Sequence, residues 1–226
     1  MSKTVPLPDK DINIGSQLTR LRYNRIASIY NFMESLPEIF FADWRNKLLA
    51  NAKGKILEVG VGTGKNFKYY PAGTDVTGID IADKMVNLAR SEAAKRCLSF
   101  NIEEGDAENL SCPDNVFDTV VATFVFCSVP DPAKGLRELR RVVKPDGQVL
   151  LLEHVRIDTP VMGWIMDRLN PLIVRIVGAN INRRTVENVK AAGFLIDKIE
   201  HLGSMKMVKM MTAKPDKDNS SAGGMA

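Results

Sequence analysis

The sequence is poor in the residues that build disulfide frameworks, metal sites and membrane spans. Its 226 residues include two histidines and three cysteines, Cys97, Cys112 and Cys127, spaced 15 residues apart with no CxxC pair. An odd number of widely spaced cysteines disfavours a disulfide framework or a zinc site and is typical of a reducing cytoplasm. No apolar run approaches the roughly 18 residues of a membrane-spanning helix, and the first residues contain no signal-like apolar run. These absences predict a cytoplasmic protein without a metal site.

The charge of the chain is nearly balanced. Lysine and arginine number 31 and aspartate and glutamate 27, so the net charge is 31 − 27 = +4, which is too small for a dedicated nucleic-acid surface. The 45% of hydrophobic residues is enough for one globular core. The composition of the two ends predicts a flexible arm over 1–15, a single domain over 16–214 and a disordered tail over 215–226. No pattern specifies an oligomeric state.

Strand and helix signals alternate along most of the domain. Short apolar runs predict strands at 55–59, 76–79, 98–103, 116–126, 148–155, 194–200 and 206–212. Helical periodicity predicts helices at 83–95, 132–143 and 184–192. Such alternation is typical of an α/β fold with a parallel sheet.

Other helices lie outside this alternation. Residues 16–36 and 38–51 have helical character and are separated by Pro37, while a helical insertion over 160–177 is expected to break at Pro171. The residues at 145–147, Pro-Asp-Gly, predict a turn.

A glycine-rich segment follows the first predicted strand. Gly60, Gly62 and Gly64 alternate with Val61 and Thr63, and this spacing fits neither the GxGxxG dinucleotide fingerprint nor a phosphate-binding P-loop. Glu58 precedes the glycines, and Asp80 ends the next predicted strand, 20 residues after Gly60. A carboxylate at that place can accept hydrogen bonds from both hydroxyls of a ribose. The pattern therefore indicates a nucleoside-containing ligand.

Five segments together resemble the successive motifs of class I S-adenosylmethionine-dependent methyltransferases: ILEVGVGTG, VTGID, EEGDAENL, FDTVVATFVFCSV and LRELRRVVKPDGQVLLLEH. The resemblance implies a Rossmann-like, doubly wound sheet of seven strands with an antiparallel last strand, and S-adenosylmethionine as the cofactor. It implies contacts from Glu58, Gly60, Gly62 and Gly64 to the methionine end, and from Asp80 to the ribose. It also places Ile81, Asp106 and Ala107 at the adenine, and the stretch from Thr123 to Cys127 at the methionine portion.

The first predicted helix carries two tyrosines on one face. Tyr23 and Tyr30 are seven residues apart, and the segment RYNRIASIYNFM resembles the opening of ubiquinone/menaquinone-type C-methyltransferases. That resemblance implies a helical lid over residues 16–51, with Tyr23 at the substrate and Tyr30 as a catalytic candidate. Core packing by an amphipathic helix is the alternative interpretation.

His154 is the second catalytic candidate. It ends the strand predicted at 148–155, at the edge where open α/β sheets place their ligands. A histidine there could act as a general base for an amine, thiol or hydroxyl acceptor. A histidine that only caps the strand is the alternative.

The insertion at 156–192 combines apolar residues with positive charge. Residues 156–190 contain six basic and three acidic side chains, with Trp164 among apolar neighbours. Such a helix could lie on an anionic membrane, with Trp164, Arg168 and Arg183 in contact with lipid or substrate, or it could cap the acceptor pocket.

The insertion also resembles part of two groups of enzymes. The stretch LLLEHVRIDTPVMGWIMDRLNPL is similar to bacterial phosphatidylethanolamine N-methyltransferases and to membrane-associated thiol S-methyltransferases. The resemblance implies methyl transfer to an amine or thiol of a lipid-like or small hydrophobic acceptor, with phosphatidylethanolamine as the first candidate. A small thiol, a quinone carbon and a non-catalytic membrane-docking module remain alternatives.

Overall fold

The computed structural model describes residues 13–33, 35–157, 159–203 and 206–217, and the side chains of residues 28–40, 176 and 177 lie outside this description. The helices are α1 (Ile14–Met33), α2 (Ser35–Leu49), α3 (Asp83–Lys95), α4 (Pro132–Val142), α5 (Pro160–Val177) and α6 (Thr185–Ala191), with a short 3-10 turn at Phe67–Tyr69. The strands are β1 (Lys55–Val59), β2 (Asp75–Asp80), β3 (Asn101–Glu104), β4 (Phe117–Thr123), β5 (Val143–His154), β6 (Phe194–Leu202) and β7 (Val208–Pro215).

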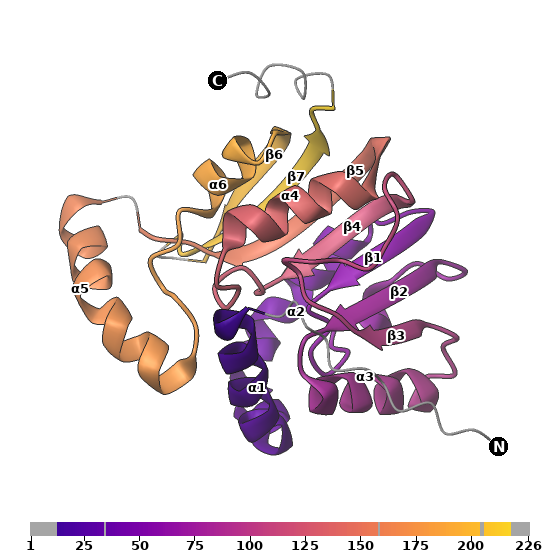
Figure 1. The fold of residues 1–226 in the computed structure, drawn as a ribbon, viewed down its shortest axis with the longest axis horizontal. Helices are drawn as coiled ribbons and strands as arrows, with labels where there is room; N and C mark the ends of the chain where they lie inside the picture. The colour runs from indigo at the N-terminus through magenta and orange to yellow at the C-terminus, as the bar shows by residue number, and fades with distance from the viewer. Residues whose placement is uncertain (1–12, 34, 158, 204–205, 218–226) are drawn as a thin grey trace.

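The strands form one seven-stranded sheet in the order β3-β2-β1-β4-β5-β7-β6 (Figure 1). The first five strands of this order are parallel to one another, and β7 runs antiparallel to both β5 and β6. The predicted fold class, a doubly wound Rossmann-like sheet with an antiparallel last strand, is confirmed. The strand order reverses direction between β1 and β4, which is where such sheets bind ligands.

The two faces of the sheet are covered by different helices. Leu57, Val120 and Leu151 point to the face covered by α4 and α6, whereas Ile56 and Leu150 point to the face that packs on the end of α2. Neighbouring residues of a strand point to opposite faces, so a central strand that is buried on both sides must be apolar throughout. This explains the unbroken apolar runs in β4 and β5.

Strand β4 ends earlier than the apolar run predicts. The expected strand continued to residue 126, but Phe124 has a φ of +58° and turns the chain away from the sheet. The Glu153 side chain of β5 accepts hydrogen bonds from the amides of Val125 and Phe126, at 3.0 and 3.2 Å. These two bonds satisfy backbone groups that leave the sheet, and they fix the loop that follows β4.

Three other local predictions are wrong. Pro37 does not separate the two N-terminal helices, since α2 already begins at Ser35. The residues at 145–147 lie within β5 and not in a separate turn, and the register of β5 against β4 shifts beside them, between Phe117 and Thr119. Helix α5 continues through Pro171 instead of breaking there. A proline inside a helix has no N–H group, so the carbonyl group one turn earlier lacks its helical hydrogen bond. Pro171 is exposed, and water can bond to that carbonyl instead.

Helix α1 lies beside the carboxyl ends of the parallel strands, next to α3, and α5 stands apart from the body (Figure 1). Asn24 of α1 donates a hydrogen bond to Asp83 of α3, and Arg20 pairs with Glu104 of β3 at 2.7 Å. The end of α5 approaches α1, because a Cβ added to Gly178 would lie 3.2 Å from the Arg22 side chain. Among the described residues, no helix is long and apolar enough to cross a membrane.

The C-terminal strand extends slightly beyond the expected domain boundary. Pro215 pairs with Phe194 in the sheet, the Asp216 carbonyl accepts hydrogen bonds from Arg140, and Lys217 donates one to Asn115. The rest of the predicted tail, and most of the predicted arm, lie outside the described residues.

Candidate active site

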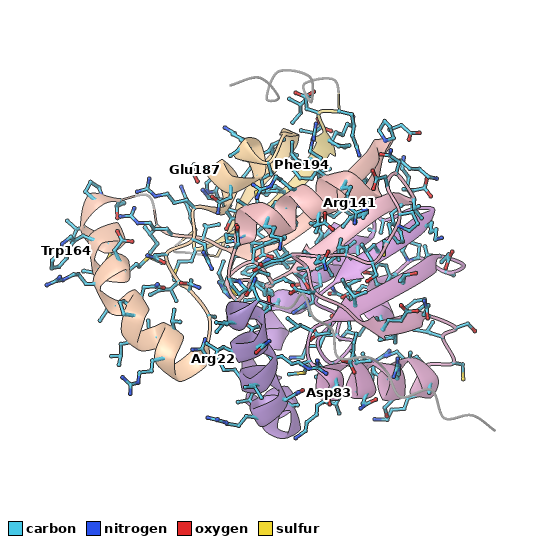
Figure 2. The ribbon with its side chains drawn as sticks, in the orientation of Figure 1. Arg22, Asp83, Arg141, Trp164, Glu187 and Phe194 are labelled. Atoms are coloured by element: carbon cyan, nitrogen blue, oxygen red, sulfur yellow. The ribbon has the colours of Figure 1, made fainter. Side chains whose placement is uncertain are left out.

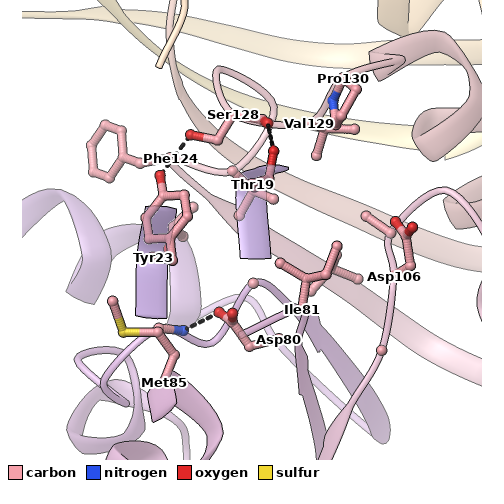
Figure 3. Close-up of a pocket in the computed structure, with 17 residues that line it drawn as sticks. Thr19, Tyr23, Asp80, Ile81, Met85, Asp106, Phe124, Ser128, Val129 and Pro130 are labelled. Atoms are coloured by element: carbon pink, nitrogen blue, oxygen red, sulfur yellow. Dashed lines mark hydrogen bonds between the residues drawn. The ribbon is translucent and has the colours of Figure 1, made fainter. Parts of the chain in front are cut away.

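A cleft opens at the carboxyl ends of β1, β2 and β4. Its lower side in the close-up carries Asp80, Ile81 and Met85, and α1 and the loop after β4 form the upper side (Figure 3). The full lining is Thr19, Tyr23, Val59, Gly60, Gly62, Asp80, Ile81, Met85, Gly105, Asp106, Ala107, Thr123, Phe124, Val125, Ser128, Val129 and Pro130. The cleft therefore lies where the topology of the sheet predicts a ligand.

Two glycines of the loop after β1 have separate structural reasons to be glycine. Gly60 has a φ of +70°, and an added Cβ would lie 2.5 Å from Val125. Gly62 has a φ of +55°, and an added Cβ would meet no heavy atom within 4 Å. Gly60 is thus required by packing and conformation, while Gly62 leaves the backbone open to a ligand in the cleft.

Asp80 connects β2 to this loop. Its carboxylate accepts hydrogen bonds from the amides of Gly62 and Ala82, at 2.9 and 3.0 Å. Burial raises the pKa of Asp80 from 3.8 to about 6. A carboxylate has about four sites for accepting hydrogen bonds, so Asp80 can hold the loop and still accept the hydroxyls of a ribose.

Most of the residues predicted to contact the cofactor come together in this cleft. The residues that line it are Gly60, Gly62, Asp80, Ile81, Asp106, Ala107 and Thr123. The other two predicted residues, Glu58 and Gly64, do not contribute to the lining. Gly64 packs against the Phe67 ring, where an added Cβ would lie 2.7 Å from the ring.

Glu58 lies beneath the glycine loop in a buried polar network. It accepts hydrogen bonds from Asn66 and Tyr70, both at 2.8 Å, and its burial raises its pKa to about 7. Arg45 of α2 donates to both Asn66 and Thr123 at 2.8 Å. The network ties α2, the glycine loop and the end of β4 together.

A smaller hollow beside the cleft is lined by members of this network. Arg45, Lys65, Asn66 and Thr123 all contribute to it, together with Gly60 and Gly62 of the glycine loop. The sequence analysis missed Arg45 and Asn66. Asn66 lies two residues after Gly64 and could have been noticed, whereas Arg45 has no motif around it.

Helix α1 closes the upper side of the cleft. The Tyr23 hydroxyl lies 2.6 Å from the Ser128 hydroxyl, and Thr19 donates a hydrogen bond to the Ser128 carbonyl at 3.3 Å (Figure 3). Tyr23, predicted at the substrate, thus lines the cleft, and Ser128 is a lining residue that sequence reasoning missed. The Tyr30 side chain lies outside the described residues, so its catalytic role stays a prediction.

The second catalytic candidate, His154, is not among the described residues that line the cleft. Its ring lies 4.6 Å from the Phe124 ring and 6.0 Å from the Phe41 ring, measured between centroids. Phe124 lines the cleft, so His154 stands behind one wall of it. The general-base role stays a prediction.

The insertion residues occupy two different environments. Trp164 and Arg168 lie on the outer side of α5, and Trp164 is 62% exposed and points away from the body (Figure 2). Arg183 instead packs inward and donates a hydrogen bond to the Val129 carbonyl at 2.7 Å. Arg183 therefore supports the loop after β4, and Trp164 and Arg168 face away from the cleft.

These residues fit the cofactor that the motifs imply. The open backbone at Gly62 and the buried carboxylate of Asp80 suit a ribose-containing ligand, and the apolar side chain of Ile81 can pack on an adenine ring. No cluster of three potential metal ligands occurs within the described ranges.

Comparison with known proteins assigns the family. Residues 57–151 match the model of the methyltransferase domain. The chain is 33% identical to human thiol S-methyltransferase TMT1A over 79% of this chain and 75% of that protein. It is 39% identical to the phosphatidylethanolamine N-methyltransferase of Cereibacter sphaeroides, over 46% of this chain and 53% of that protein.

Two further similarities agree with this assignment. The ubiquinone/menaquinone biosynthesis C-methyltransferase UbiE of Bdellovibrio bacteriovorus is 33% identical over 72% of each chain. A SAM-dependent methyltransferase structure from Thermotoga maritima has the same fold, with a TM-score of 0.67 and 19% identity over 87% of this chain and 99% of that one. The chain therefore belongs to the S-adenosylmethionine-dependent methyltransferases and is an enzyme of that family, with S-adenosylmethionine as its cofactor.

Proposed function

We propose that this methyltransferase modifies an amine or thiol of a lipid-like or small hydrophobic acceptor, with the amine of phosphatidylethanolamine as the first candidate. The observation that carries the proposal is the outer face of α5. Val161, Trp164 and Leu172 recur there at helical spacing and are 69%, 62% and 57% exposed. Arg168 and Arg175 share this face, and the Arg168 guanidinium lies 5.9 Å from the Trp164 ring. Exposed apolar residues among arginines suit the surface of an anionic membrane.

The inner side of α5 is connected to the cleft by a short chain of contacts. Asn170 of α5 bonds to Asn180 at 3.0 Å, and the Asn180 side chain donates to the Cys127 carbonyl at 2.9 Å. Cys127 precedes Ser128 of the cleft lining. The helix that carries the proposed membrane face is therefore joined through its inner side to the loop that lines the cleft.

The residues of the cleft bind and orient the reactants and exclude water. The bound cofactor supplies an electrophilic methyl group on a sulfonium. Gly62 and Asp80 hold and orient that cofactor, and α1 covers the upper side of the cleft and limits the access of water. Alignment of the acceptor and exclusion of water are the main requirements of a direct transfer.

An acceptor panel tests the proposal. The enzyme is incubated with isotopically labelled S-adenosylmethionine and, separately, with phosphatidylethanolamine vesicles, hexane-1-thiol, a reduced quinone and a polar amine. Mass spectrometry identifies the labelled product. Methylation of the vesicle lipid or the thiol is expected, whereas labelling of only the quinone or the polar amine would overturn the proposal.

A small thiol is the second candidate, and a specific observation favours it. Among the described residues that line the cleft, there is no histidine, lysine or arginine, and the carboxylic acids are Asp80 and Asp106. A cysteine-like thiol has an ordinary pKa of about 8.5, roughly two units below that of an alkylammonium group such as the lysine side chain. A site whose described lining has no histidine or lysine therefore suits a thiol, and the similarity to a thiol S-methyltransferase supports the same choice.

Membrane binding through α5 can be measured separately from catalysis. We expect the enzyme to co-sediment with anionic vesicles and less with neutral ones, and Trp164→Ala or Arg168→Ala to weaken this binding about fivefold. Leu195→Ala is the matched control, because Leu195 is 59% exposed on β6, away from α5. Binding that is indifferent to lipid charge, or that Leu195→Ala weakens equally, would contradict a membrane role for α5.

A further inference from the structure

The cleft has two chemically different sides. The side formed by the glycine loop, Asp80, Ile81 and Asp106 carries the residues that the family motifs predict for the cofactor. The other side is formed by α1 and the loop after β4, and those motifs leave most of it unassigned. Its lining residues are Thr19, Tyr23, Phe124, Ser128, Val129 and Pro130. This second side is called the acceptor side below.

The acceptor side is mainly apolar, and its main polar feature is a pair of hydroxyl groups. Phe124, Val129 and Pro130 supply carbon surface, and the Thr19 hydroxyl is used in its bond to the Ser128 carbonyl. The hydroxyls of Tyr23 and Ser128 form a pair at 2.6 Å. Tyr23 comes from the covering helix and Ser128 from the loop after β4, so the pair joins α1 to that loop across the cleft.

From this arrangement we infer that the Tyr23–Ser128 hydroxyl pair binds the acceptor atom through its N–H or S–H group and makes the site specific for protic groups on an apolar body. The inference rests on the proposed function and names the residues that would select the acceptor. A serine hydroxyl has two lone pairs, so Ser128 can accept a hydrogen bond from the acceptor in addition to its contact with Tyr23. The surrounding apolar residues hold the remainder of the acceptor by burial.

The contact also gives the acceptor atom an orientation. A group that donates its hydrogen to Ser128 points its lone pair elsewhere, which restricts how it meets the methyl carbon. The new bond to that carbon forms as the carbon–sulfur bond of the sulfonium breaks, with the bonding pair left on sulfur. The proton of the acceptor then leaves through the hydroxyl pair to water. Ser128 and Tyr23 thereby bind, orient and deprotonate without a histidine in the cleft.

A pair of matched probes tests the inference without turnover. Hexane-1-thiol and hexyl methyl sulfide have the same apolar chain, but only the thiol has an S–H group. With the enzyme saturated by S-adenosylhomocysteine, titration followed by NMR should show that the thiol binds about threefold to tenfold more tightly. Ser128→Ala and Tyr23→Phe should reduce this preference, and Ser128→Thr should retain it.

A control variant separates acceptor binding from simple attachment of α1. Asn24 neighbours Tyr23 and holds α1 on α3 through Asp83, but it does not line the cleft. Asn24→Ala should leave the preference for the thiol unchanged. All variants should bind S-adenosylhomocysteine within about twofold of the parent enzyme in calorimetry, which also shows that they are folded.

Each other result overturns the inference. Equal binding of thiol and sulfide to the parent enzyme, or binding of neither probe while S-adenosylhomocysteine binds, would contradict a protic acceptor site. An equal loss of preference in Asn24→Ala and Ser128→Ala would show that the hydroxyl pair only fastens α1. Failure of the acceptor panel, by contrast, concerns turnover and leaves these binding results intact, so the two failures can be distinguished.

Discussion

An enzyme that carries Asp80→Ala is expected to bind S-adenosylmethionine about 100-fold more weakly, or worse, than the parent enzyme. Two hydrogen bonds from ribose hydroxyls to a carboxylate contribute roughly 1.5–3 kcal/mol each. The substitution also removes the acceptor for the amides of Gly62 and Ala82, which hold the glycine loop at 2.9 and 3.0 Å. Calorimetric titration with S-adenosylmethionine or S-adenosylhomocysteine measures the loss.

Asp75→Ala is the matched control for this substitution. Asp75 begins β2 and Asp80 ends it, so the two carboxylates lie at opposite ends of one strand. Asp75 is exposed and remote from the cleft, and its removal should leave the affinity unchanged. An affinity of Asp80→Ala within about threefold of the parent would contradict the ribose role of this residue.

The pH dependence of binding gives a second measure of the same carboxylate. Burial raises the pKa of Asp80 to about 6, and the ionised form is the better acceptor for the hydroxyls of the ribose. Affinity should therefore be constant above about pH 7 and fall as the pH drops through about 6, by up to about tenfold per pH unit. Asp80→Asn cannot ionise and should flatten this fall, whereas a fall that persists in Asp80→Asn would assign it to another group.

Phe126→Ala is expected to cause a large loss of stability. Phe126 lies between the lining residues Val125 and Ser128, yet its side chain is 1% exposed and belongs to the core under α4. Truncating such a ring removes apolar burial and leaves a cavity, at a cost of about 3–5 kcal/mol. For a chain of this size, the loss lowers the unfolding midpoint by roughly 6–20 °C. Thermal or urea unfolding followed by circular dichroism measures it.

Leu195→Ala is the comparison for Phe126→Ala. Leu195 is an apolar residue in β6 that is 59% exposed, so its truncation should change the free energy of unfolding by about 0.5 kcal/mol or less. Similar losses in the two variants would show that Phe126 is not a core residue.

The stretch from Thr123 to Cys127 was predicted to face the cofactor as a whole. The structure divides it, since Thr123, Phe124 and Val125 line the cleft and Phe126 and Cys127 are buried.

The elements whose signals are local could be predicted from the sequence. The helix expected at 83–95 has the same bounds as α3, and the strand expected at 55–59 has those of β1. The glycines and Asp80 could be assigned to one site because parallel strands bring their carboxyl ends to one edge of the sheet. In each case, a few adjacent residues carry the whole signal.

The residues that sequence reasoning missed depend on distant contacts. Arg45 reaches Thr123 across 78 residues and Tyr23 reaches Ser128 across 105, and neither pairing leaves a pattern in the local sequence. Glu58 was expected to line the methionine end, but it is directed beneath the loop because Asn66 and Tyr70 donate to it there. Pro171 also shows the effect of tertiary surroundings. Because Pro171 is exposed, water can replace the hydrogen bond that the proline removes, and the helix continues through it.

The sequence by itself determined the order of strands and helices and the glycine loop with its acidic partner. These features follow from the alternation of apolar residues, from turn chemistry and from motifs only a few residues long. Only the tertiary structure decided which residues face the cleft opposite the glycine loop, because α1 and the loop after β4 are remote in the chain and meet only in the folded protein. It also separated Arg183, which packs on that loop, from Trp164, which faces solvent. Both belong to the same basic insertion, and burial is a property of the assembled fold.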